Sequence, residues 1–243
     1  MFAQYIKRQP GQDWGANEEK YATLGDKAVS CIQNNTYVLA IDYFNQMLSI
    51  NCKNADRQKD YFSLSYCYFQ TSEYDKTIEA CNNYIKLSPI DDPNLKDIYF
   101  YQGFSYAMKG DNNNAILCFE KAISQSSPTD YHSLAQNHYL AARCYYILEK
   151  DYLAEINYKK AISYGCKQEG ITIKQIETDG CENFGLGEMF YYYSLLKEKS
   201  YNDWIYLIYL SAKCGHPEGM NQANKYSLFQ WSSIPTPSKD LFQ

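Results

Sequence analysis

Several signatures of enzymes and membrane proteins are missing from this sequence of 243 residues. It contains no GxSxG, HExxH, Walker or Rossmann glycine motif, and its three histidines have no readable arrangement of Ser, Cys or carboxylates around them. No apolar run approaches the roughly 18 residues that a membrane-spanning helix needs. We therefore expect no enzyme, no cofactor and no membrane insertion, and a hydrolase or metal enzyme is the weakest of three functional hypotheses.

Runs of one charge sign are also absent. The chain has 23 basic and 28 acidic residues, which gives a net charge of −5. A nucleic-acid surface needs clustered Lys and Arg, and an anionic membrane surface attracts similar clusters. Nucleic acid and membrane surfaces are therefore disfavoured as partners, whereas a hydrophobic content of 45% allows a sizeable core.

Cysteine occurs nine times, but without CxxC pairs or other metal or disulfide spacings. We expect most of these cysteines to be free thiols, several of them packed as small apolar groups on helix faces. This favours a reducing compartment, so a cytoplasmic location is expected. A secreted or periplasmic location is the alternative, because Phe2-Ala3-Gln4 is similar to the end of a signal peptide whose basic and apolar regions are missing.

One zinc hypothesis can be formed, from Cys166, Cys181, Cys214 and His216. The Cys214-x-His216 spacing is tighter than in common zinc pairs, and a long gap precedes it. No metal site is therefore predicted.

What the sequence does contain is a repeat of two short helical patterns. One position, occupied mostly by a small residue, recurs at steps of 37, 38 and 39 residues, at Ala40, Thr77, Ala115 and Ala154. Four further columns stay in register with it: Phe44, Cys81, Phe119 and Tyr158; Met47, Tyr84, Ala122 and Ala161; Ala28, Ser65, Gly103 and Ala142; Cys31, Tyr68, Tyr106 and Tyr145. Small residues let the two helices of a hairpin cross closely, and large ones fill the gaps between hairpins. Because one hairpin cannot bury both of its apolar stripes, we expect a stack of hairpins.

This pattern resembles the tetratricopeptide repeat, whose unit of about 34 residues has small, aromatic and alanine positions at the same spacing. The resemblance covers roughly residues 21 to 166, and Pro89 and Pro128 stand where the family has a helix-ending proline. The units would start near Tyr21, Gln58, Lys96 and Ala135. The resemblance implies an all-α fold, a right-handed α-α superhelix of antiparallel helix pairs.

The rest of the chain predicts flanking segments of different character. The expected order is an N-terminal arm (1–16), four helix pairs (17–166), a connector (167–183), capping helices (184–231) and an extended tail (232–243). The connector is polar and interrupted by glycine, with one short helix at Ile171 to Ile176. Three capping helices are expected at Phe184–Lys199, Tyr201–Cys214 and Pro217–Trp231.

The junction before the last of these helices, Ala212 to Gly219, resembles that of the Sel1-like repeat, a relative of the tetratricopeptide repeat. Pro217 would stand in the first turn of the new helix, where its missing N–H costs nothing. The polar side chains of that helix would then cap the stack.

In this family, particular positions of each unit's first helix line a concave groove, and here those positions are mostly aromatic. The resemblance implies a peptide-binding groove made by Phe62, Tyr66, Phe69, Phe100, Phe104, Tyr139, Arg143 and Tyr146. Aromatic side chains offer large contact area at low entropic cost, which suits a peptide with apolar anchors. A clamp for a terminal carboxylate is not expected, because Arg143 is the one basic residue of the set. Packing alone is the alternative explanation for several of these rings.

The sequence therefore predicts a non-enzymatic interaction module or scaffold that binds a protein or peptide of unknown identity. The alternative is a structural or self-associating solenoid, a homo-oligomer, whose groove is filled by its own terminal segment. That segment would be the Trp14 region or the tail, which carries Leu228, Phe229, Trp231, Ile234, Leu241 and Phe242.

Overall fold

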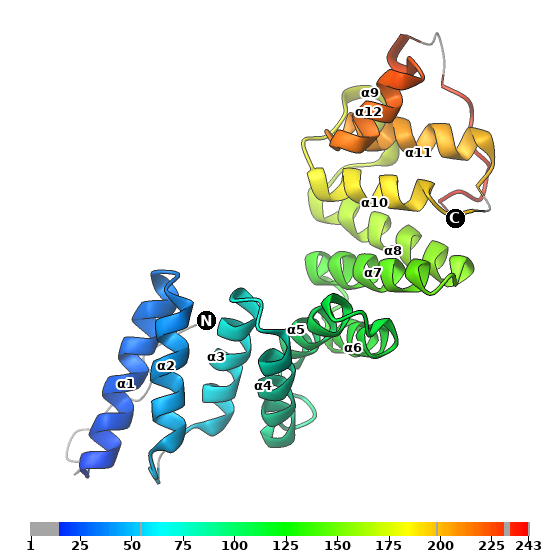
Figure 1. The fold of residues 1–243 in the computed structure, drawn as a ribbon. Helices are drawn as coiled ribbons and strands as arrows, with labels where there is room; N and C mark the ends of the chain where they lie inside the picture. Colours follow the sequence, from blue (N-terminus) through cyan, green and yellow to red (C-terminus); the bar gives the residue numbers. More distant parts are fainter. Residues whose placement is uncertain (1–14, 54, 198, 231–233, 243) are drawn as a thin grey trace. The chain divides into compact units, whose positions relative to one another are not determined.

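The structure is a computed structural model that describes residues 15–53, 55–197, 199–230 and 234–242. Within these ranges it contains twelve α-helices, one short 3-10 helix and no β-strand. The chain divides into two compact units, residues 1–111 and 112–243 (Figure 1). The predicted N-terminal arm lies outside the described residues except for its last two positions, and α1 begins at the second of these, Ala16.

Unit 1 consists of five helices, of which successive ones pack against each other. Their bounds are α1 Ala16–Gln33, α2 Tyr37–Ser49, α3 Arg57–Gln70, α4 Tyr74–Leu87 and α5 Leu95–Met108. The predicted starts at Gln58 and Lys96 agree with α3 and α5 to within one residue, and α1 begins before the predicted Tyr21.

Unit 2 holds the remaining helices. Their bounds are α6 Asn112–Gln125, α7 Tyr131–Ile147, α8 Asp151–Glu169, α9 Ile173–Asp179, α10 Phe184–Ser194, α11 Tyr201–Lys213, α12 Pro217–Lys225 and the 3-10 helix η1 Leu228–Gln230. α8 continues beyond the predicted end at residue 166 and stops at Gly170, whose φ of 66° is left-handed. Gly165 lies within α8 and does not interrupt it. It allows close packing against α10, because a Cβ there would lie 2.7 Å from the Leu186 side chain.

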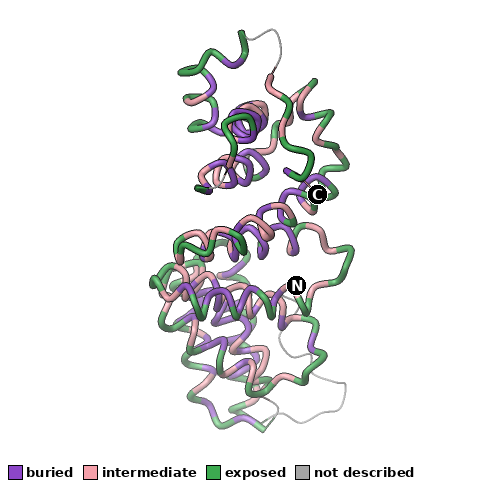
Figure 2. The backbone as a smooth tube through the Cα atoms, turned by 90° about the vertical axis from the view of Figure 1, so that its right-hand side faces the viewer, coloured by how far each residue is buried: buried purple, intermediate pink, exposed green. Residues whose placement is uncertain are grey.

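The repeat columns form the core, as the sequence predicts. Ala40, Thr77, Ala115 and Ala154 are each 0% exposed. The column four residues on is equally buried, at Phe44, Cys81, Phe119 and Tyr158. Burial accordingly alternates with exposure along the helices (Figure 2). The column at Cys31, Tyr68, Tyr106 and Tyr145 is less deep, since three of its members are only half-buried.

Each hairpin turns at a residue with left-handed backbone conformation. These residues are Asn35, Ser72, Gly110 and Glu149, with φ of 57°, 59°, 80° and 56°. They are separated by steps of 37, 38 and 39 residues, the same steps as the alanine column. Only Gly110 belongs to a residue type that adopts this conformation without steric cost. The turn column was therefore not visible in the sequence.

Buried carboxylates fix the connections between the hairpins of unit 1. The fully buried Asp60 accepts hydrogen bonds from the Tyr21 hydroxyl at 2.8 Å and from the Arg57 guanidinium at 3.1 Å. Asp92, in the next connection, accepts from the Tyr84 hydroxyl at 2.7 Å. Asp60, in the first turn of α3, thus ties this helix to α1, and Asp92 ties the connection before α5 to α4.

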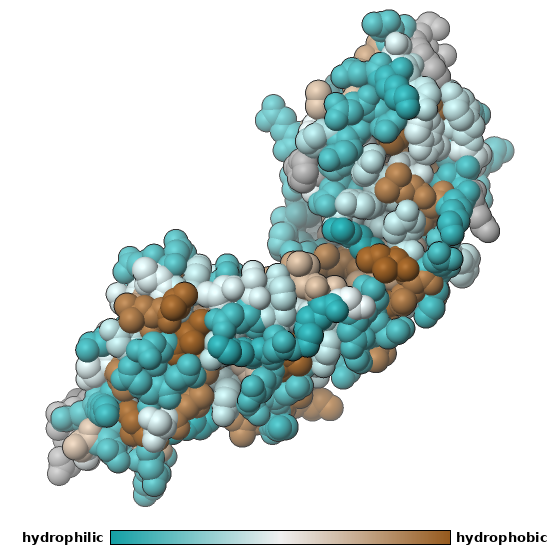
Figure 3. All heavy atoms as spheres, viewed as in Figure 1, coloured by the Kyte–Doolittle hydropathy of each residue, from teal (hydrophilic) through white to brown (hydrophobic). Residues whose placement is uncertain are grey.

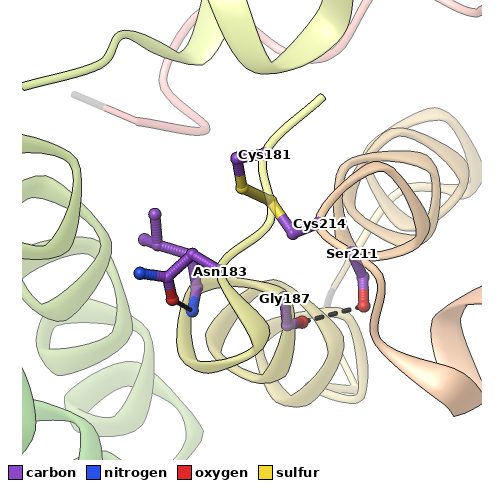
Figure 4. The surroundings of a disulfide bond; sticks show 6 residues. Cys181, Asn183, Gly187, Ser211 and Cys214 are labelled. Atoms are coloured by element: carbon purple, nitrogen blue, oxygen red, sulfur yellow. Dashed lines mark hydrogen bonds between the residues drawn. A yellow bond between two sulfur atoms is a disulfide. The ribbon is translucent and has the colours of Figure 1, made fainter. Parts of the chain in front are cut away.

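Most of the cysteines are free thiols, as expected, but one pair in unit 2 is bonded. Cys181 and Cys214 form a disulfide across a Cα–Cα distance of 4.5 Å (Figure 4). The Cys181 amide donates to the Lys213 carbonyl at 3.0 Å, which brings the end of the connector beside the end of α11. This pairing could not be predicted from the sequence, because the two residues are 33 positions apart and belong to no recognisable framework. The other seven cysteines are free, and six of them are buried.

Candidate functional site

Partly exposed aromatic rings gather on the first helices of the second and third hairpins. We call Tyr66 and Phe69 of α3 together with Phe100, Tyr101 and Phe104 of α5 the aromatic surface. The Phe69 ring is its centre: its centroid lies 4.9 Å from that of Tyr101, 5.3 Å from Phe104 and 5.9 Å from Phe100. The Tyr66 and Tyr101 centroids are 6.0 Å apart. The five rings are therefore contiguous.

Helical spacing explains why these rings share one side. Tyr66 and Phe69 are three residues apart on α3, and Phe100 and Phe104 are four apart on α5, so each pair lies on one face of its helix. The opposite side of α5 is occupied by core packing, where Ile98 is fully buried. All five rings remain part-exposed, in edge-to-face or tilted contacts at distances that favour aromatic pairs.

Phe62 does not belong to this surface. It is 8% exposed, and its ring lies 5.7 Å from that of Tyr84 in the core between α3 and α4. Its place in the predicted groove is corrected accordingly: Phe62 holds two helices together and offers almost no area to a ligand.

The other three predicted groove residues, Tyr139, Arg143 and Tyr146, belong to α7 of unit 2. Tyr139 is 7% exposed and so belongs to the core, where burial raises its pKa. The Arg143 guanidinium lies 4.6 Å from the Tyr192 ring centroid and 3.9 Å from a Glu188 oxygen, both on α10. Arg143 therefore links α7 to α10. Tyr146 is half-buried against the same core.

A second site is made where the end of the chain lies on unit 2. The C-terminal segment, residues 234–242, returns past α11 towards α10 (Figure 1). Leu241 is only 2% exposed. The Phe242 centroid lies 6.2 Å from that of Phe190, 6.5 Å from Tyr193 and 6.2 Å from Tyr206. The segment is thus anchored by its last two apolar residues.

Polar contacts hold the main chain of the same segment. The Lys159 ammonium donates to the Asp240 carbonyl at 2.6 Å, and the Tyr193 hydroxyl lies 3.0 Å from the Leu241 carbonyl. Asp203 accepts from the Ser238 amide at 2.7 Å and from its hydroxyl at 3.0 Å. We call the side chains that make these polar contacts, or the ring contacts with Phe242, the tail seat. They are Lys159 of α8, Phe190 and Tyr193 of α10, and Asp203 and Tyr206 of α11.

An ion pair beneath the tail seat orients its central hydroxyl. The Lys199 ammonium lies 2.7 Å from a Glu155 oxygen and donates to the Tyr193 hydroxyl at 3.2 Å. Burial opposes the charge of Glu155, but the bonds from Lys199 and Tyr193 outweigh it and hold the pKa of Glu155 below its usual value. Glu155 also pairs with Lys159 at 3.3 Å. The single phenolic proton of Tyr193 lies within hydrogen-bond distance of two acceptors, Glu155 at 2.9 Å and the Leu241 carbonyl at 3.0 Å, which share it.

The described residues do not assemble a metal site. They hold no group of three or more His, Cys, Asp or Glu side chains that could bind a metal ion. Two of the four residues of the zinc hypothesis, Cys181 and Cys214, are instead bonded to each other. In the same residues, none of the helices combines the length and the apolar character needed to cross a bilayer.

Comparison with solved structures places the fold in the class of tetratricopeptide-like α-solenoids. A crystal structure of the MamA protein matches with a TM-score of 0.55 and 16% identity over 90% of this chain and 100% of that chain. A second MamA crystal structure gives 0.53 and 16% over 82% and 97%, and the apo form of RapI gives 0.62 and 16% over 86% and 72%. The fold predicted from the repeat columns is thereby confirmed.

The sequence itself matches no protein-family model and no curated protein. At 16% identity the likeness to MamA and RapI establishes the fold alone.

Proposed function

We propose that this chain is a non-enzymatic protein-interaction module that binds an apolar peptide segment on the aromatic surface of unit 1. The single observation that carries the proposal is the contiguity of five part-exposed rings around Phe69. A solenoid needs its small and large repeat columns for stacking, and those columns are already buried. Tyr66 and Tyr101 also pack against buried clusters that contain column residues. Phe69, Phe100 and Phe104 are members of none of the columns, so stacking of the columns does not account for these three rings.

The chemistry of the surface indicates the ligand. Aromatic side chains dominate binding energy at interfaces because each buries a large area with few rotatable bonds. Four or five adjacent rings suit an extended or helical segment with two or more apolar anchors. Phosphate and carboxylate are disfavoured as ligands, since the five members contribute no cation.

A peptide selection tests the proposal. The full chain is immobilised and a random dodecapeptide display library is selected on it, and enriched peptides are measured by fluorescence anisotropy. We expect apolar-rich peptides that bind Phe69→Ala/Phe104→Ala at least about tenfold more weakly, because hot-spot aromatics contribute about 2 kcal/mol or more each.

The matched control is Ile90→Ala, which removes an apolar side chain that is 89% exposed in the connection between α4 and α5 of the same unit. It should leave affinity unchanged. Equal affinity of the enriched peptides for wild type and the double variant, with unchanged helical circular dichroism, would count decisively against the aromatic surface.

Self-association is a second candidate function, favoured by apolar side chains exposed near the end of unit 2. Met220 of α12 is 42% exposed and Phe229 of η1 is 49% exposed, although the polar side chains of α12 also face solvent as expected of a cap. On the drawn face, apolar surface forms separate patches among hydrophilic side chains (Figure 3). Light scattering decides: an oligomer that Met220→Lys/Phe229→Lys dissociates supports this function, and a monomer at high concentration rejects it.

We also infer that α11 and α12 form a Sel1-like unit. Pro217 stands in the first turn of α12, and Gly215 provides the left-handed turn with φ of 79°. Gly219 lies so close to α11 that a Cβ would be 2.3 Å from the Ser211 hydroxyl oxygen. Gly219→Ala should therefore lower the melting temperature, whereas Met220→Ala, one position on and exposed, should not.

A further inference from the structure

The tail seat holds its occupant partly through contacts that do not depend on the occupant's own side chains. Lys159 and Tyr193 both bind main-chain carbonyls, those of Asp240 and Leu241. Residues 238–241 form a turn, in which the Leu241 amide donates to the Ser238 carbonyl at 3.2 Å. A peptide that forms the same turn presents the same carbonyls whatever its side chains, because they belong to the backbone.

Other contacts do read side chains. The Ser238 hydroxyl bonds Asp203, Leu241 is buried, and Phe242 touches three rings. The side chains of Lys239 and Asp240 between them are exposed. The tail seat thus selects a Ser-x-x-Leu-Phe sequence whose first four residues form a turn, with free choice at the two middle positions.

The C-terminal segment does not fill the space available to it. A cavity of about 300 Å³ remains between its residues 234–237 and the side chains of Glu177, Tyr206 and Tyr209. Pro235 lines this cavity and is half-buried. A larger apolar side chain at the position of Pro235 would bury more area against Tyr206 and Tyr209. A peptide with such a side chain should therefore bind more tightly than the segment itself.

Competition decides which occupant can replace the segment. A tethered ligand is present at an effective concentration on the order of millimolar, so the same segment from a second copy of the chain would not displace it at ordinary concentrations. An external segment succeeds only through contacts that the tethered one lacks. The cavity beside Pro235 is where such contacts are available.

We propose that the tail seat is a peptide-binding site for another protein's segment of the form Ser-x-x-Leu-Phe, with a turn over its first four residues and a bulky apolar residue before it, and that residues 234–242 are its tethered competitor. The site lies in unit 2, is independent of the aromatic surface of unit 1, and goes beyond the function proposed above.

Two labelled nonapeptides test this on the full chain by fluorescence anisotropy. One has the sequence of residues 234–242, IPTPSKDLF, and the other carries Trp in place of Pro235. The variant Leu241→Ala releases the tethered segment, since it deletes the deepest anchor. We expect the first peptide to bind Leu241→Ala at least about tenfold more tightly than wild type, and the Trp peptide to bind both proteins more tightly than the first does.

The controls separate the tail seat from general effects. Lys239→Ala, in the same segment but exposed, should behave as wild type. Adding Tyr193→Phe to Leu241→Ala should weaken both peptides, because it removes the hydroxyl while keeping the ring. Phe69→Ala/Phe104→Ala should not change their binding, so failure of this proposal and failure of the aromatic surface are distinguishable.

The outcomes that overturn the proposal are equally specific. Absence of binding to Leu241→Ala, at unchanged helical circular dichroism, removes the peptide site. If Leu241→Ala lowers the helical signal, Phe242→Ala replaces it and the same criterion applies. If the two peptides bind with equal affinity, the ligand does not require the bulky apolar residue. If a peptide binds wild type and Leu241→Ala with equal affinity, residues 234–242 do not compete for the tail seat.

Discussion

At the scale of single residues, a few polar side chains determine how firmly each connection is held. Tyr21 is fully buried, donates to Asp60, and accepts from the Asp56 amide at 3.1 Å. Burial, with the nearby Asp60 charge, raises the pKa of Tyr21 far above its ordinary value. The hydroxyl therefore stays protonated and serves as a permanent donor to a carboxylate that water does not reach.

Removing that hydroxyl should weaken unit 1. Tyr21→Phe keeps the ring but deprives the buried Asp60 of a hydrogen bond, so we expect a loss of about 1 to 2 kcal/mol in the free energy of unfolding. Urea denaturation followed by circular dichroism measures it. Tyr43→Phe is the matched control, because this part-exposed ring of α2 keeps its contact with Lys27. Equal stabilities of the two variants would contradict the role assigned to Asp60.

His216 makes the stability of α12 dependent on pH. Its Nδ1 accepts from the Gly219 amide at 3.2 Å and caps the helix, which requires a neutral ring. Burial lowers the pKa of His216 below its ordinary 6.5, against the opposing charges of Glu218 and Glu188. A lowered folded-state pKa gives stability that is present above pH 6.5 and is lost as pH falls through the folded value.

The melting temperature of wild type should decline as the pH falls below about 6.5. The decline should be smaller in His216→Asn, because Asn caps helices without titrating. His138 is also buried with a lowered pKa, so it contributes in the same direction and His138→Gln serves as the second arm. Identical pH profiles for wild type and His216→Asn would show that the cap does not titrate in this range.

At the scale of elements, the turns and the connector are more informative than the helices. Helix positions and the buried columns follow from apolar periodicity, which the sequence shows directly. Turn conformation does not, because Asn35, Ser72 and Glu149 adopt left-handed geometry that only the surrounding hairpin imposes. The disulfide was missed for a related reason, since α9 and α11 meet only in the folded chain.

The left-handed turns can be improved. Ser72→Gly removes the steric cost of a φ of 59° while adding flexibility to the unfolded chain, so the net gain should be about 0.5 to 1 kcal/mol. Ser72→Ala removes the same hydroxyl without easing the backbone and should give no gain. Thermal denaturation of the pair measures the difference, and a Gly variant no more stable than the Ala variant would refute the assignment of strain.

The disulfide should stabilise the end of unit 2. It closes a loop with a sequence separation of 33, and the smaller chain entropy of the cross-linked unfolded state corresponds to a stabilisation of about 4 kcal/mol. Reduction with dithiothreitol should therefore lower the melting temperature of wild type. Cys181→Ser/Cys214→Ser should melt at the lower temperature with or without reductant. A wild-type melting temperature indifferent to reductant would mean that the bond contributes nothing.

At the scale of the whole molecule, the stacking of hairpins was predictable and the sites were less so. Columns of small and large residues repeat four times, which is enough to define the class. The groove prediction depended on helix positions alone and could not distinguish Phe62 and Tyr139, which are core, from Phe69 and Phe104, which stay part-exposed. The tail seat required contacts between residues up to 81 positions apart, as between Lys159 and Asp240.

The matching steps of the alanine column and the turn column have a consequence for how this chain can change length. Both columns advance by 37, 38 and 39 residues, so the spacing from each turn to the buried position of the second helix is constant. Length variation thus lies outside that spacing, at helix ends, as in α7 and α8, and in the connections, where Ile90 is 89% exposed. A reporter sequence placed beside Ile90 would leave each hairpin's internal spacing intact, whereas a single residue inserted at a turn would shift an entire buried column out of register.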